Sequence, residues 1–415
     1  MANGKCRITG HPLEECIDLG NQYVSNFVQP GYEKDGEIGS LKLGIGPKSG
    51  LPQLFETFPP EKMYKRYWYR SGINDSMRAE LRNITESAMS YLHLNPGDTV
   101  LDIASNDGTL LSYYPEMLNR IGIDPSDVAV ESELYGGKIT LINDFFSAKA
   151  YHSITDSKAK IITIIAMFYD LEDPLNVLRQ VRNIIDDQGV LIIQLSYTPF
   201  MLDQNEFGNI CHEHLCYYTL KNLKSLLEEA GFEIFDVMMN TTNGGSIRVY
   251  ATPKGSTEYL SCPLHWLSVG RARLIGTLEY EKTEKLDTIE PYLRFKRNIE
   301  TLKSETMNWL QRQADSNKKV VGYGASTKGN VLLQYYGITK DLIPCIAEAN
   351  QKKWGLCTIG TGIPVISEAE MRAMKPDYLF VLPWFFIKYF IEREKNLLAG
   401  GTRFVMPQPW LRVIE

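Results

Sequence analysis

Two histidines, a glutamate and two cysteines lie within six consecutive residues, in the stretch CHEHLC from Cys211 to Cys216. The whole chain has only six histidines and seven cysteines, so this concentration suggests chemistry. A zinc site would need four ligands, but no second cluster supplies the missing ones, and zinc ligands usually stand farther apart in sequence. A general base is the better interpretation, because histidine titrates near neutral pH and a neighbouring carboxylate can orient it. We therefore expect His214 to be a base supported by Glu213, the alternative being a histidine hydrogen-bonded in a polar loop.

A second set of candidate residues follows the ends of successive expected strands. The segment VLDIASNDGTLLSYY reads as a strand that ends at Asp102, a turn of small residues and a helix that starts near Thr109. A ligand at this turn would meet backbone N–H groups at the start of a helix. At the end of the next strand, Asp124 can accept hydrogen bonds from both hydroxyls of a ribose. After the third strand, Asp144 can bind an adenine amino group while Phe145 stacks on the base.

These acids and the aromatic residue, in this order, resemble the cofactor site of S-adenosylmethionine-dependent methyltransferases. The turn adds Ala104, Asn106 and Gly108 as cofactor-binding candidates. Ala104 stands where that family usually has its first glycine, and alanine is tolerated there unless the turn needs a positive φ. The alternatives are an ordinary α/β turn or a site for another adenosine-containing ligand.

A second glycine-containing loop, VVGYGASTKGN, begins at Val320. It is not a P-loop, because Lys328 follows Thr327 instead of preceding a serine or threonine. Its glycines fit a dinucleotide pattern only loosely, although Glu348 ends the next expected strand, where a ribose-binding acid would stand. The loop fits either a phosphate-bearing ligand, with Lys328 as the point charge, or a plain turn with a solvated lysine.

Two parallel sheets are needed to position these candidates, and the apolar pattern predicts both. Residues 1–72 are rich in glycine, proline and short apolar runs and predict a small, loop-rich module. Residues 73–255 alternate helical stretches with short apolar strands, which predicts a Rossmann-like α/β domain that ends in two antiparallel strands around a Gly-Gly turn. Residues 256–415 predict a long helix and then a second, smaller Rossmann-like domain.

Composition restricts the class of function. The 415 residues are 44% hydrophobic, enough for two or three packed domains. A net charge of −6 and the lack of a basic tract argue against binding to nucleic acid. The cysteines suggest no disulfide framework and the N-terminus no signal peptide, so we expect a cytoplasmic protein. The most apolar stretch, DYLFVLPWFFIKYFIERE, is too short to span a membrane and predicts a strand that runs into a helix.

Taken together, the chain resembles the sugar C-methyltransferases that act on nucleotide-linked keto-deoxysugars. The matching segments, in chain order, are YWYRSGIND, VLDIASNDGTLL, IGIDPS, NEFGNICHEHLCYYTL, NGGSIRVYATP, VVGYGASTKGNVLLQYYGI, GLCTIGTGIPVI and PDYLFVLPWFF. They span nearly the whole chain, and the HEH and GYGASTKGN segments are the most specific. The resemblance implies an N-terminal zinc-binding module, a central methyltransferase domain that uses S-adenosylmethionine, and a C-terminal domain that helps to hold a thymidine- or guanosine-diphosphate sugar.

The resemblance also implies a mechanism and a set of site residues. A ketone at C4 of the sugar acidifies the C3 proton, His214 removes this proton, and the carbanion attacks the methyl group of S-adenosylmethionine. Tyr69 and Glu213 would support the developing oxyanion. The residues placed around the nucleotide sugar are Cys211, Asn243, Arg248, Gly324, Ser326, Lys328, Asn330 and Glu348.

The N-terminal module departs from the pattern of this family, which has two CxxC pairs. The four positions of those pairs are occupied here by Cys6, Thr9, Gly46 and Ser49. Since three of the four ligands are missing, a tetrahedral zinc site should not form. Cys16 and His11 are poorly spaced as substitutes, so we expect a module held together by packing alone.

Two further departures lie near the expected active site. Cys211 stands where a tyrosine usually precedes HEH, and Asn243 stands where a histidine usually precedes the GGS turn. They indicate a different sugar, nucleotide or oxyanion support more than a different reaction. The alternatives are an O- or N-methyltransferase and a protein that binds a nucleotide sugar without catalysis. An NAD-dependent oxidoreductase is disfavoured for want of its catalytic motif, and no pattern indicates an oligomeric state.

Overall fold

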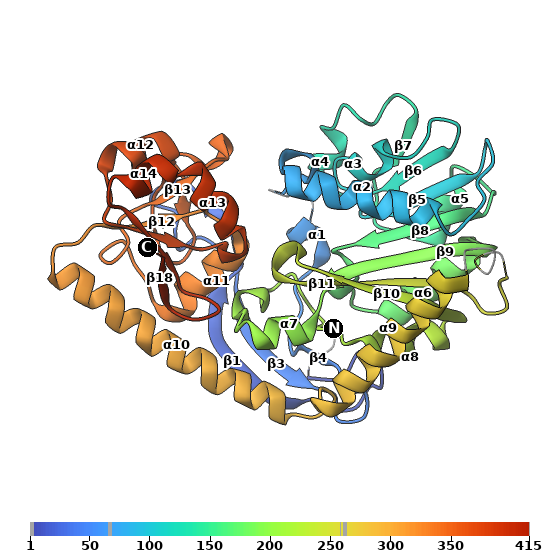
Figure 1. The fold of residues 1–415 in the computed structure, drawn as a ribbon, viewed down its shortest axis with the longest axis horizontal. Coiled ribbons are helices and arrows are strands. Elements are labelled where there is room, and N and C mark those ends of the chain that lie inside the picture. The colour runs from blue at the N-terminus through green and yellow to red at the C-terminus, as the bar shows by residue number, and fades with distance from the viewer. Residues whose placement is uncertain (1–3, 65–68, 258, 260–263, 415) are drawn as a thin grey trace.

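The computed structural model describes residues 4–64, 69–257, 259 and 264–414. Two large sheets lie at the right and left of Figure 1, and the N-terminal strands and a long helix pass beneath both. Each large sheet is mainly parallel with helices on its faces, so the α/β fold class predicted from the sequence is confirmed. Among the described helices, none combines the length and the apolar character that a membrane crossing requires.

The central sheet, at the right of Figure 1, has seven strands in the order β10-β11-β9-β8-β5-β6-β7. Its strands are β5 (Thr99–Ile103), β6 (Asn119–Ile123), β7 (Ile139–Ile142), β8 (Ala159–Ile165), β9 (Ile185–Ser196), β10 (Phe232–Asn240) and β11 (Ser246–Pro253). Strands β5 to β9 pair in parallel, and β11 lies antiparallel between β9 and β10. This is the Rossmann-like sheet with a closing antiparallel pair that the sequence predicts.

Helices cover both faces of this sheet. They are α2 (Asp75–Met89), α3 (Thr109–Ser112), α4 (Asp127–Val130), α5 (Ala148–His152), α6 (Pro174–Ile184), α7 (Thr198–Asp203) and α8 (Leu220–Glu229). Successive strand residues point to opposite faces. Val100 therefore joins one apolar cluster with α2 and α3, whereas Leu101 joins another with α6 and α8. Burial on both faces explains why these strands are apolar without alternation.

The C-terminal sheet, at the left of Figure 1, has six strands in the order β15-β13-β12-β16-β17-β18. Its elements are β12 (Val320–Tyr323), α11 (Thr327–Tyr336), β13 (Ile346–Glu348), β15 (Val365–Ser367), α12 (Glu368–Met374), β16 (Tyr378–Val381), α13 (Ile387–Arg393), α14 (Lys395–Ala399), β17 (Arg403–Met406) and β18 (Arg412–Ile414). All neighbours pair in parallel except β17 and β18. The second Rossmann-like sheet and the apolar strand that runs into a helix, here β16 and α13, are thus present as predicted.

The N-terminal segment connects both large sheets. Its strands β1 (Glu14–Tyr23), β3 (Ile38–Ile45) and β4 (Pro52–Leu54) form a small antiparallel sheet, followed by α1 (Pro60–Tyr64). A short strand, β2 (Phe27–Val28), pairs with β14 (Cys357–Thr358) of the C-terminal part. Gln53 forms a β-bridge with Cys216 of the HEH stretch. The sequence predicts a loop-rich module but not these two connections.

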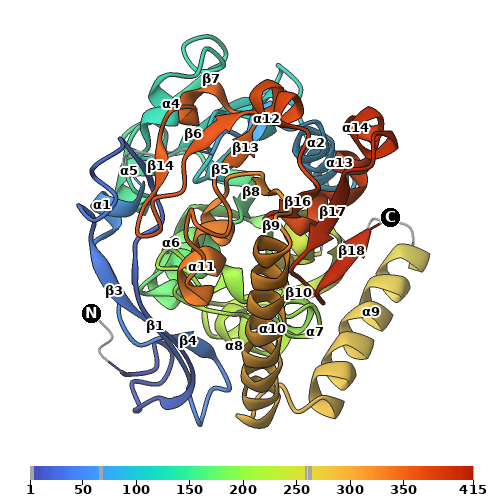
Figure 2. The same ribbon diagram turned by 90° about the vertical axis from the view of Figure 1, so that its left-hand side faces the viewer.

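Two long helices follow the central sheet, α9 (Leu264–Thr283) and α10 (Glu290–Asp315). The sequence predicts α10, which runs beneath the molecule from the central part to the C-terminal sheet (Figures 1 and 2). It does not predict α9, which packs on β10 through an ion pair of 2.6 Å between Arg273 and Asp236. The packing of α9 associates it with the central sheet, although the sequence places the domain boundary before it, at residue 256. The three-domain division itself stays a prediction.

Candidate active site

The turn between β5 and α3 is built from unusual backbone conformations. Ala104, Asn106 and Gly108 have φ angles of 60°, 50° and 79°. The backbone N–H of Asn106 donates to Asp124 Oδ2 at 2.8 Å, so the acid at the end of β6 holds the turn in place. The turn therefore does require a positive φ at Ala104, the condition under which alanine is a poorer choice than glycine.

The acids predicted for the cofactor site lie at the carboxyl ends of neighbouring strands. Asp102 is buried and accepts a hydrogen bond of 2.6 Å from the Thr163 hydroxyl. Burial raises the pKa of Asp102 to about 7, against this hydrogen bond and with help from the charges of Asp124 and Asp107. Asp124 also accepts a hydrogen bond of 2.8 Å from the N–H of Ser126. Both acids are thus integrated into the protein on the edge of the sheet where ligands bind in such folds.

The end of β7 offers a more open carboxylate. Asp144 is exposed and Phe145 is half-buried, and they follow the strand directly. The Asn143 side chain donates to the backbone oxygen of Asp124 at 2.9 Å, which ties the ends of β6 and β7 together. The Asp144 carboxylate accepts a hydrogen bond of 2.8 Å from the N–H of Phe145 through Oδ1 and is otherwise exposed. This carboxylate, an aromatic ring and the turn after β5 therefore share one edge, an arrangement that fits the adenosine part of S-adenosylmethionine.

The segment after α1 docks on the same turn. The N–H of Ser71 donates to Asn106 Oδ1 at 2.9 Å, and the N–H of Gly72 donates to Asp107 Oδ2 at 2.8 Å. Asn106 Nδ2 donates in return to the backbone oxygen of Tyr69 at 3.1 Å. Tyr69, with 43% of its surface exposed, thus lies beside this turn between β5 and α3, which we call the cofactor turn because the cofactor is predicted to bind there.

The HEH stretch lies in a loop that follows the carboxyl end of β9. His214 Nδ1 is 2.9 Å from the backbone oxygen of Asn209, and its ring lies 4.2 Å from the Tyr169 ring, centroid to centroid. Since a carbonyl oxygen only accepts, Nδ1 must carry the hydrogen, which leaves Nε2 as a proton acceptor. Burial, and secondly the charge of Lys328, lower the pKa of His214 to about 3. The imidazole is therefore neutral at physiological pH.

The other histidine of the stretch holds the N-terminal module. His212 is buried, with Nε2 at 3.2 Å from the backbone oxygen of Gly39 and its ring edge-on to Phe58. Burial lowers the pKa of His212 to about 4. From α1, the Tyr64 hydroxyl donates to the backbone oxygen of Glu213 at 3.0 Å. The N-terminal module therefore fixes the loop that carries His214.

The C-terminal sheet reaches the same loop from the other side. Lys328, in the first turn of α11, donates from Nζ to the backbone oxygen of Asn243 at 3.2 Å and lies over the Phe385 ring. Its charge acts on His214, as the lowered pKa shows. Glu206, buried beside η3 (Phe207–Asn209), accepts a hydrogen bond from the Trp384 indole. The structure thus brings together His214, Lys328 and Asn243, which are far apart in the sequence.

Comparison with known proteins agrees with this arrangement. A family model described as a methyltransferase domain matches residues 74–237, and one described as a C-methyltransferase C-terminal domain matches residues 241–409. The C-methyltransferase NovU of Streptomyces niveus is 25% identical over 420 residues, which cover 99% of this chain and 97% of NovU. The chain belongs to the S-adenosylmethionine-dependent C-methyltransferases.

Solved structures resemble parts of this C-methyltransferase. A S-adenosylmethionine-dependent methyltransferase from Aquifex aeolicus is 19% identical, covers 47% of this chain and 98% of its own, and has a TM-score of 0.33. Magnesium protoporphyrin IX methyltransferase from Synechocystis PCC 6803, with bound S-adenosylmethionine, is 16% identical, covers 43% and 77%, and has a TM-score of 0.30. At such TM-scores the likeness carries no weight for function.

Several residues that the sequence assigns to the substrate have other partners in the methyltransferase. Arg248 is buried, and its guanidinium binds Glu80 Oε1 at 2.6 Å, Gln194 Oε1 at 2.7 Å and Asn83 Oδ1 at 3.0 Å. Its N–H groups are directed to protein atoms, so Arg248 fastens α2 to the sheet. The partners of Arg248 thus belong to the protein, and its substrate role stays a prediction.

The loop of the C-terminal sheet is likewise supported from within. Glu348 accepts hydrogen bonds from the N–H groups of Ala325 at 2.9 Å and Asn350 at 2.8 Å, as Asp124 does for the cofactor turn. Ser326 caps α11 by accepting from the N–H of Gly329 at 3.1 Å. Asn330 is buried and donates to the backbone oxygen of Asn26 in the N-terminal module.

At the start of this loop, Gly324 has a φ of 82°, and a Cβ there would lie 2.6 Å from the Pro383 ring. Its glycine is therefore required by the local backbone and by the close approach of the proline. For Gly324, Ser326, Asn330 and Glu348, the recorded partners belong to the protein, and any substrate role stays a prediction. Cys211 is buried beside the Glu213 carboxyl and also stays a predicted neighbour of the substrate.

The positions of the expected zinc ligands do converge. The Cys6 thiol lies 3.1 Å from the Ser49 hydroxyl, and a Cβ on Gly46 would lie 2.8 Å from the Cys6 sulfur. Burial raises the pKa of Cys6, but hydrogen bonds from Ser49 and Thr9 outweigh it, and the net pKa is lowered. Within the described part of the chain, no group of three or more potential ligands could hold a metal ion. The module thus retains the geometry of the site with one sulfur ligand.

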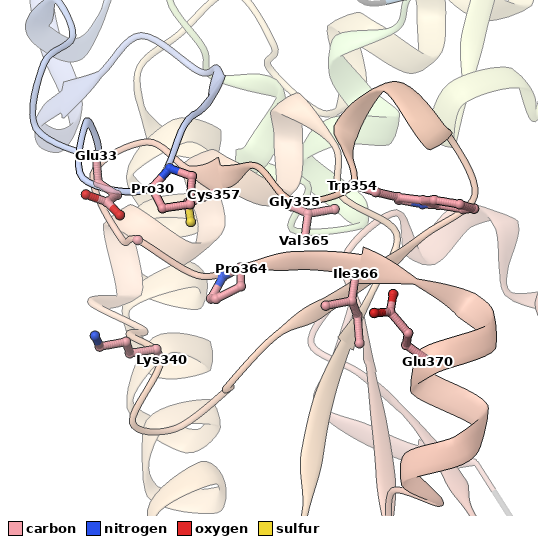
Figure 3. A pocket seen from close by; sticks show the side chains of 11 residues that line it. Pro30, Glu33, Lys340, Trp354, Gly355, Cys357, Pro364, Val365, Ile366 and Glu370 are labelled. Atoms are coloured by element: carbon pink, nitrogen blue, oxygen red, sulfur yellow. The ribbon is translucent and has the colours of Figure 1, made fainter.

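A cavity of about 640 Å³ lies elsewhere, on the outer edge of the C-terminal sheet (Figure 3). Pro30 and Glu33 of the N-terminal segment line one end, and Trp354, Ile366 and Glu370 line the other. None of the residues around His214 lines it. It is therefore not part of the candidate active site.

Proposed function

We propose that this methyltransferase adds a methyl group to C3 of a nucleotide-linked 4-keto-6-deoxysugar, in the synthesis of a branched-chain sugar. The observation that carries the proposal is the state of His214: its Nδ1 is engaged by Asn209, no described residue forms a hydrogen bond with its Nε2, and the ring is neutral. A neutral, oriented imidazole suits removal of a carbon-bound proton. The ketone makes the neighbouring proton acidic enough for such a base.

The proton passes from C3 of the sugar to Nε2 of His214, and the electron pair of the C–H bond moves onto the keto oxygen. Tyr69 and Glu213 are proposed to stabilise the negative charge on that oxygen. S-adenosylmethionine, when bound, supplies a methyl group already activated by a sulfonium. Asp102, Asp124, Asp144 and Phe145 are proposed to hold it at the edge of the central sheet. Because the donor is activated, positioning and proton removal carry most of the catalysis.

A charged substrate is supported by Lys328, which stands near His214 on the side of the C-terminal sheet. We propose that it binds the diphosphate of a thymidine- or guanosine-diphosphate sugar, with Asn243 and Cys211 nearby. The full-length match to NovU, a protein named a C-methyltransferase, supports methylation on carbon. The sugar, the position C3 and the roles of these residues all belong to the proposal.

The test is to incubate the protein with S-adenosylmethionine and a panel of nucleotide 4-keto-6-deoxysugars, and to locate the new methyl group by NMR. The wild type should add one methyl group to carbon, and His214→Ala should not. In deuterium oxide without S-adenosylmethionine, the wild type should exchange the C3 proton and the variant should not. Methylation on oxygen or nitrogen would refute the proposal and leave the wider family assignment intact.

A further inference from the structure

A buried carboxyl group, Glu206, lies at the contact between the C-terminal sheet and the segment that orients His214. Only 4% of the surface of Glu206 is exposed, and it directly precedes η3. The backbone oxygen of Glu206 accepts a hydrogen bond of 3.2 Å from the N–H of Asn209, the last residue of η3. The backbone oxygen of Asn209 in turn holds His214 Nδ1 at 2.9 Å. Glu206 is therefore connected to the histidine through one short turn of the chain.

The turn η3 packs closely on α11 of the C-terminal sheet. The ring centroids of Phe207 and Tyr336 lie 5.3 Å apart. A Cβ on Gly208 would lie 2.8 Å from the backbone oxygen of Lys328 and 3.2 Å from both Lys328 Cβ and Glu206 Oε1. The carboxyl group of Glu206 and the residue Lys328 are therefore neighbours, and both lie against Gly208.

The hydrogen-bond donor to this carboxyl group also comes from the C-terminal sheet. Glu206 Oε2 accepts a hydrogen bond from the indole N–H of Trp384, the first residue of η7 (Trp384–Phe386), which follows β16. Burial raises the pKa of Glu206, although the charge of Lys328 and this hydrogen bond oppose the rise. The indole donor and the lysine charge both belong to the C-terminal sheet, so the carboxyl group of Glu206 joins this sheet to η3.

The position of Lys328 depends on this contact. Lys328 Nζ donates to the backbone oxygen of Asn243 at 3.2 Å and lies 5.2 Å from the centre of the Phe385 ring, next to Trp384. An ammonium group carries three N–H donors, and Asn243 takes one of them. How far this ammonium group lies from His214 is set by the way α11 and η7 sit on η3.

We infer that Glu206 is a positioning residue for the substrate: by joining Trp384 to η3, it keeps Lys328 at the distance from His214 that the nucleotide sugar requires. This inference rests on the proposed function, in which Lys328 binds the diphosphate and His214 removes the C3 proton. The diphosphate and C3 belong to one molecule, so the groups that bind them must keep a fixed separation. Glu206 itself touches neither and acts only as a hydrogen-bond acceptor.

The first experiment needs no substrate and follows the indole N–H of Trp384 by NMR in the full chain, with Trp384→Phe used to assign its signal. In the wild type this proton should exchange slowly with solvent, because it is hydrogen-bonded to Glu206. Glu206→Ala should speed the exchange about tenfold or more, whereas Glu206→Gln, which keeps an oxygen acceptor, should retain slow exchange. Trp410, with 59% of its surface exposed, is the internal control and should not change. Equal exchange in the wild type and Glu206→Ala would overturn the inference.

The second experiment separates KM from kcat in methyl transfer. Glu206→Ala and Trp384→Phe should each raise KM for the nucleotide sugar about tenfold, because Lys328 is no longer held in place. The value of kcat should change by less than about twofold, since Asn209 still orients His214. The double variant should match either single variant, because the two side chains form one interaction.

Two further variants complete this comparison. Glu206→Gln should keep KM at or below the wild-type value, because glutamine still accepts from Trp384 and carries no charge that repels the diphosphate. Glu229→Ala is the matched control, since the Glu229 carboxylate pairs with Arg179 at the exposed surface of α8. A rise of KM in Glu206→Gln equal to that in Glu206→Ala, or an unchanged KM in Glu206→Ala, would refute the positioning role.

The two proposals fail in different ways. If no keto-sugar is methylated, the proposed function is wrong, yet the exchange of the Trp384 indole N–H and its dependence on Glu206 are still measured. If the wild type methylates a keto-sugar but Glu206→Ala exchanges slowly or keeps its KM, only the role of Glu206 is wrong.

Discussion

At the scale of single residues, Ala104 in the cofactor turn shows the conformational strain of an alanine at a position where glycine is usual. Ala104 takes a φ of 60°, which places its Cβ close to the backbone. For an L-residue this conformation costs about 1–2 kcal/mol of strain. Glycine would remove the strain, but part of the gain would be offset because glycine increases the conformational entropy of the unfolded chain. The sequence alone indicates that alanine is unfavourable if this turn needs a positive φ. Only the structure shows that Ala104 has a positive φ.

Ala104→Gly should therefore raise the free energy of unfolding by about 1 kcal/mol, because glycine adopts a positive φ without strain. Chemical denaturation of both proteins measures the change. Ala79→Gly is the matched control: Ala79 is exposed in the middle of α2, where glycine should instead lower the free energy of unfolding by about 1 kcal/mol. A destabilised Ala104→Gly variant would show that the turn does not hold this φ in solution.

The lowered pKa of His214 predicts an unusual pH dependence. An ordinary histidine has a pKa of about 6.5 and loses its basic form below that pH. Since burial and Lys328 lower the pKa of His214 to about 3, its basic form persists under mildly acidic conditions. The value of kcat/KM for methyl transfer, measured from about pH 5 to 8, should show no fall on the acidic side that belongs to His214. A fall centred near the ordinary histidine pKa would contradict this.

The segment that carries Asp170 shows why the sequence indicates some site residues and not others. The sequence FYDLEDP contains three acids, and nothing in their types or spacing distinguishes them. In the structure Asp173 caps α6 and Glu172 pairs with Arg7, whereas Asp170 has one buried oxygen without a hydrogen-bond partner among the described residues. His214 and Lys328 could be singled out because they belong to recognisable motifs. Asp170 could not, because its surroundings depend on the distant HEH loop, which is hydrogen-bonded to the preceding residue, Tyr169.

At the scale of elements, the periodic ones follow from sequence and the others do not. Short, mainly apolar strands such as β5 and β8 are predicted because burial on both faces favours apolar residues at successive positions. Helix α9 is not predicted, since its sequence, LHWLSVGRARLIGTLEYEKT, places apolar and charged residues without a single stripe. Its position depends instead on polar contacts: Arg273 binds Asp236, and Glu281 accepts from the N–H of Leu220, the first residue of α8.

The N-terminal module allows a test of whether the four positions expected to bind zinc still lie close enough together to do so. Cys6 sits against Ser49 and Gly46, and side chains around it favour its thiolate. Replacing Thr9, Gly46 and Ser49 together by cysteine should therefore create a four-sulfur site that binds one zinc ion. Zinc should stabilise this variant by about 4 kcal/mol when free zinc is roughly a thousandfold above its dissociation constant.

Metal analysis and thermal unfolding with and without a chelator measure the binding and the stabilisation. The wild type should contain no bound zinc, and its thermal unfolding should be the same with and without the chelator. Restoring only Gly46→Cys and Ser49→Cys should give weaker binding, since a tetrahedral site then lacks one ligand. A folded triple variant that binds no zinc would show that the four positions no longer converge closely enough.

At the scale of the whole molecule, the proposed base His214 lies where three parts of the chain meet. The loop of His214 belongs to the central sheet, the N-terminal module binds it through His212 and Tyr64, and the C-terminal sheet contributes Lys328. The local motifs were evident from the sequence, but their convergence depends on how the parts pack. The loop that carries His214 therefore depends on both neighbouring parts of the chain for its surroundings.

Lys328→Met should raise the pKa of His214, because it removes a positive charge that opposes protonation of the imidazole. NMR titration of the histidine ring protons in the full chain measures this, with His214→Gln used to assign the signal.

Lys328→Met should also raise KM for the nucleotide sugar about tenfold or more, as expected for the loss of a charged hydrogen bond. Lys340→Met, at an exposed position after α11, is the control and should change neither quantity. An unchanged pKa of His214 in Lys328→Met would show that the charge of Lys328 does not act on the imidazole.

The pairing of β2 with β14 has a consequence for how the protein is made. Val28 leaves the ribosome several hundred residues before its partner Cys357, because the chain is synthesised from its N-terminal side. The central sheet can complete its pairing earlier, because its strands lie between residues 99 and 253. Strand β2 must therefore remain unpaired while hundreds of later residues are added. Domains otherwise tend to fold in the order of their synthesis. Strand β2 is therefore paired later than the strands of the central sheet, although it precedes all of them in the chain.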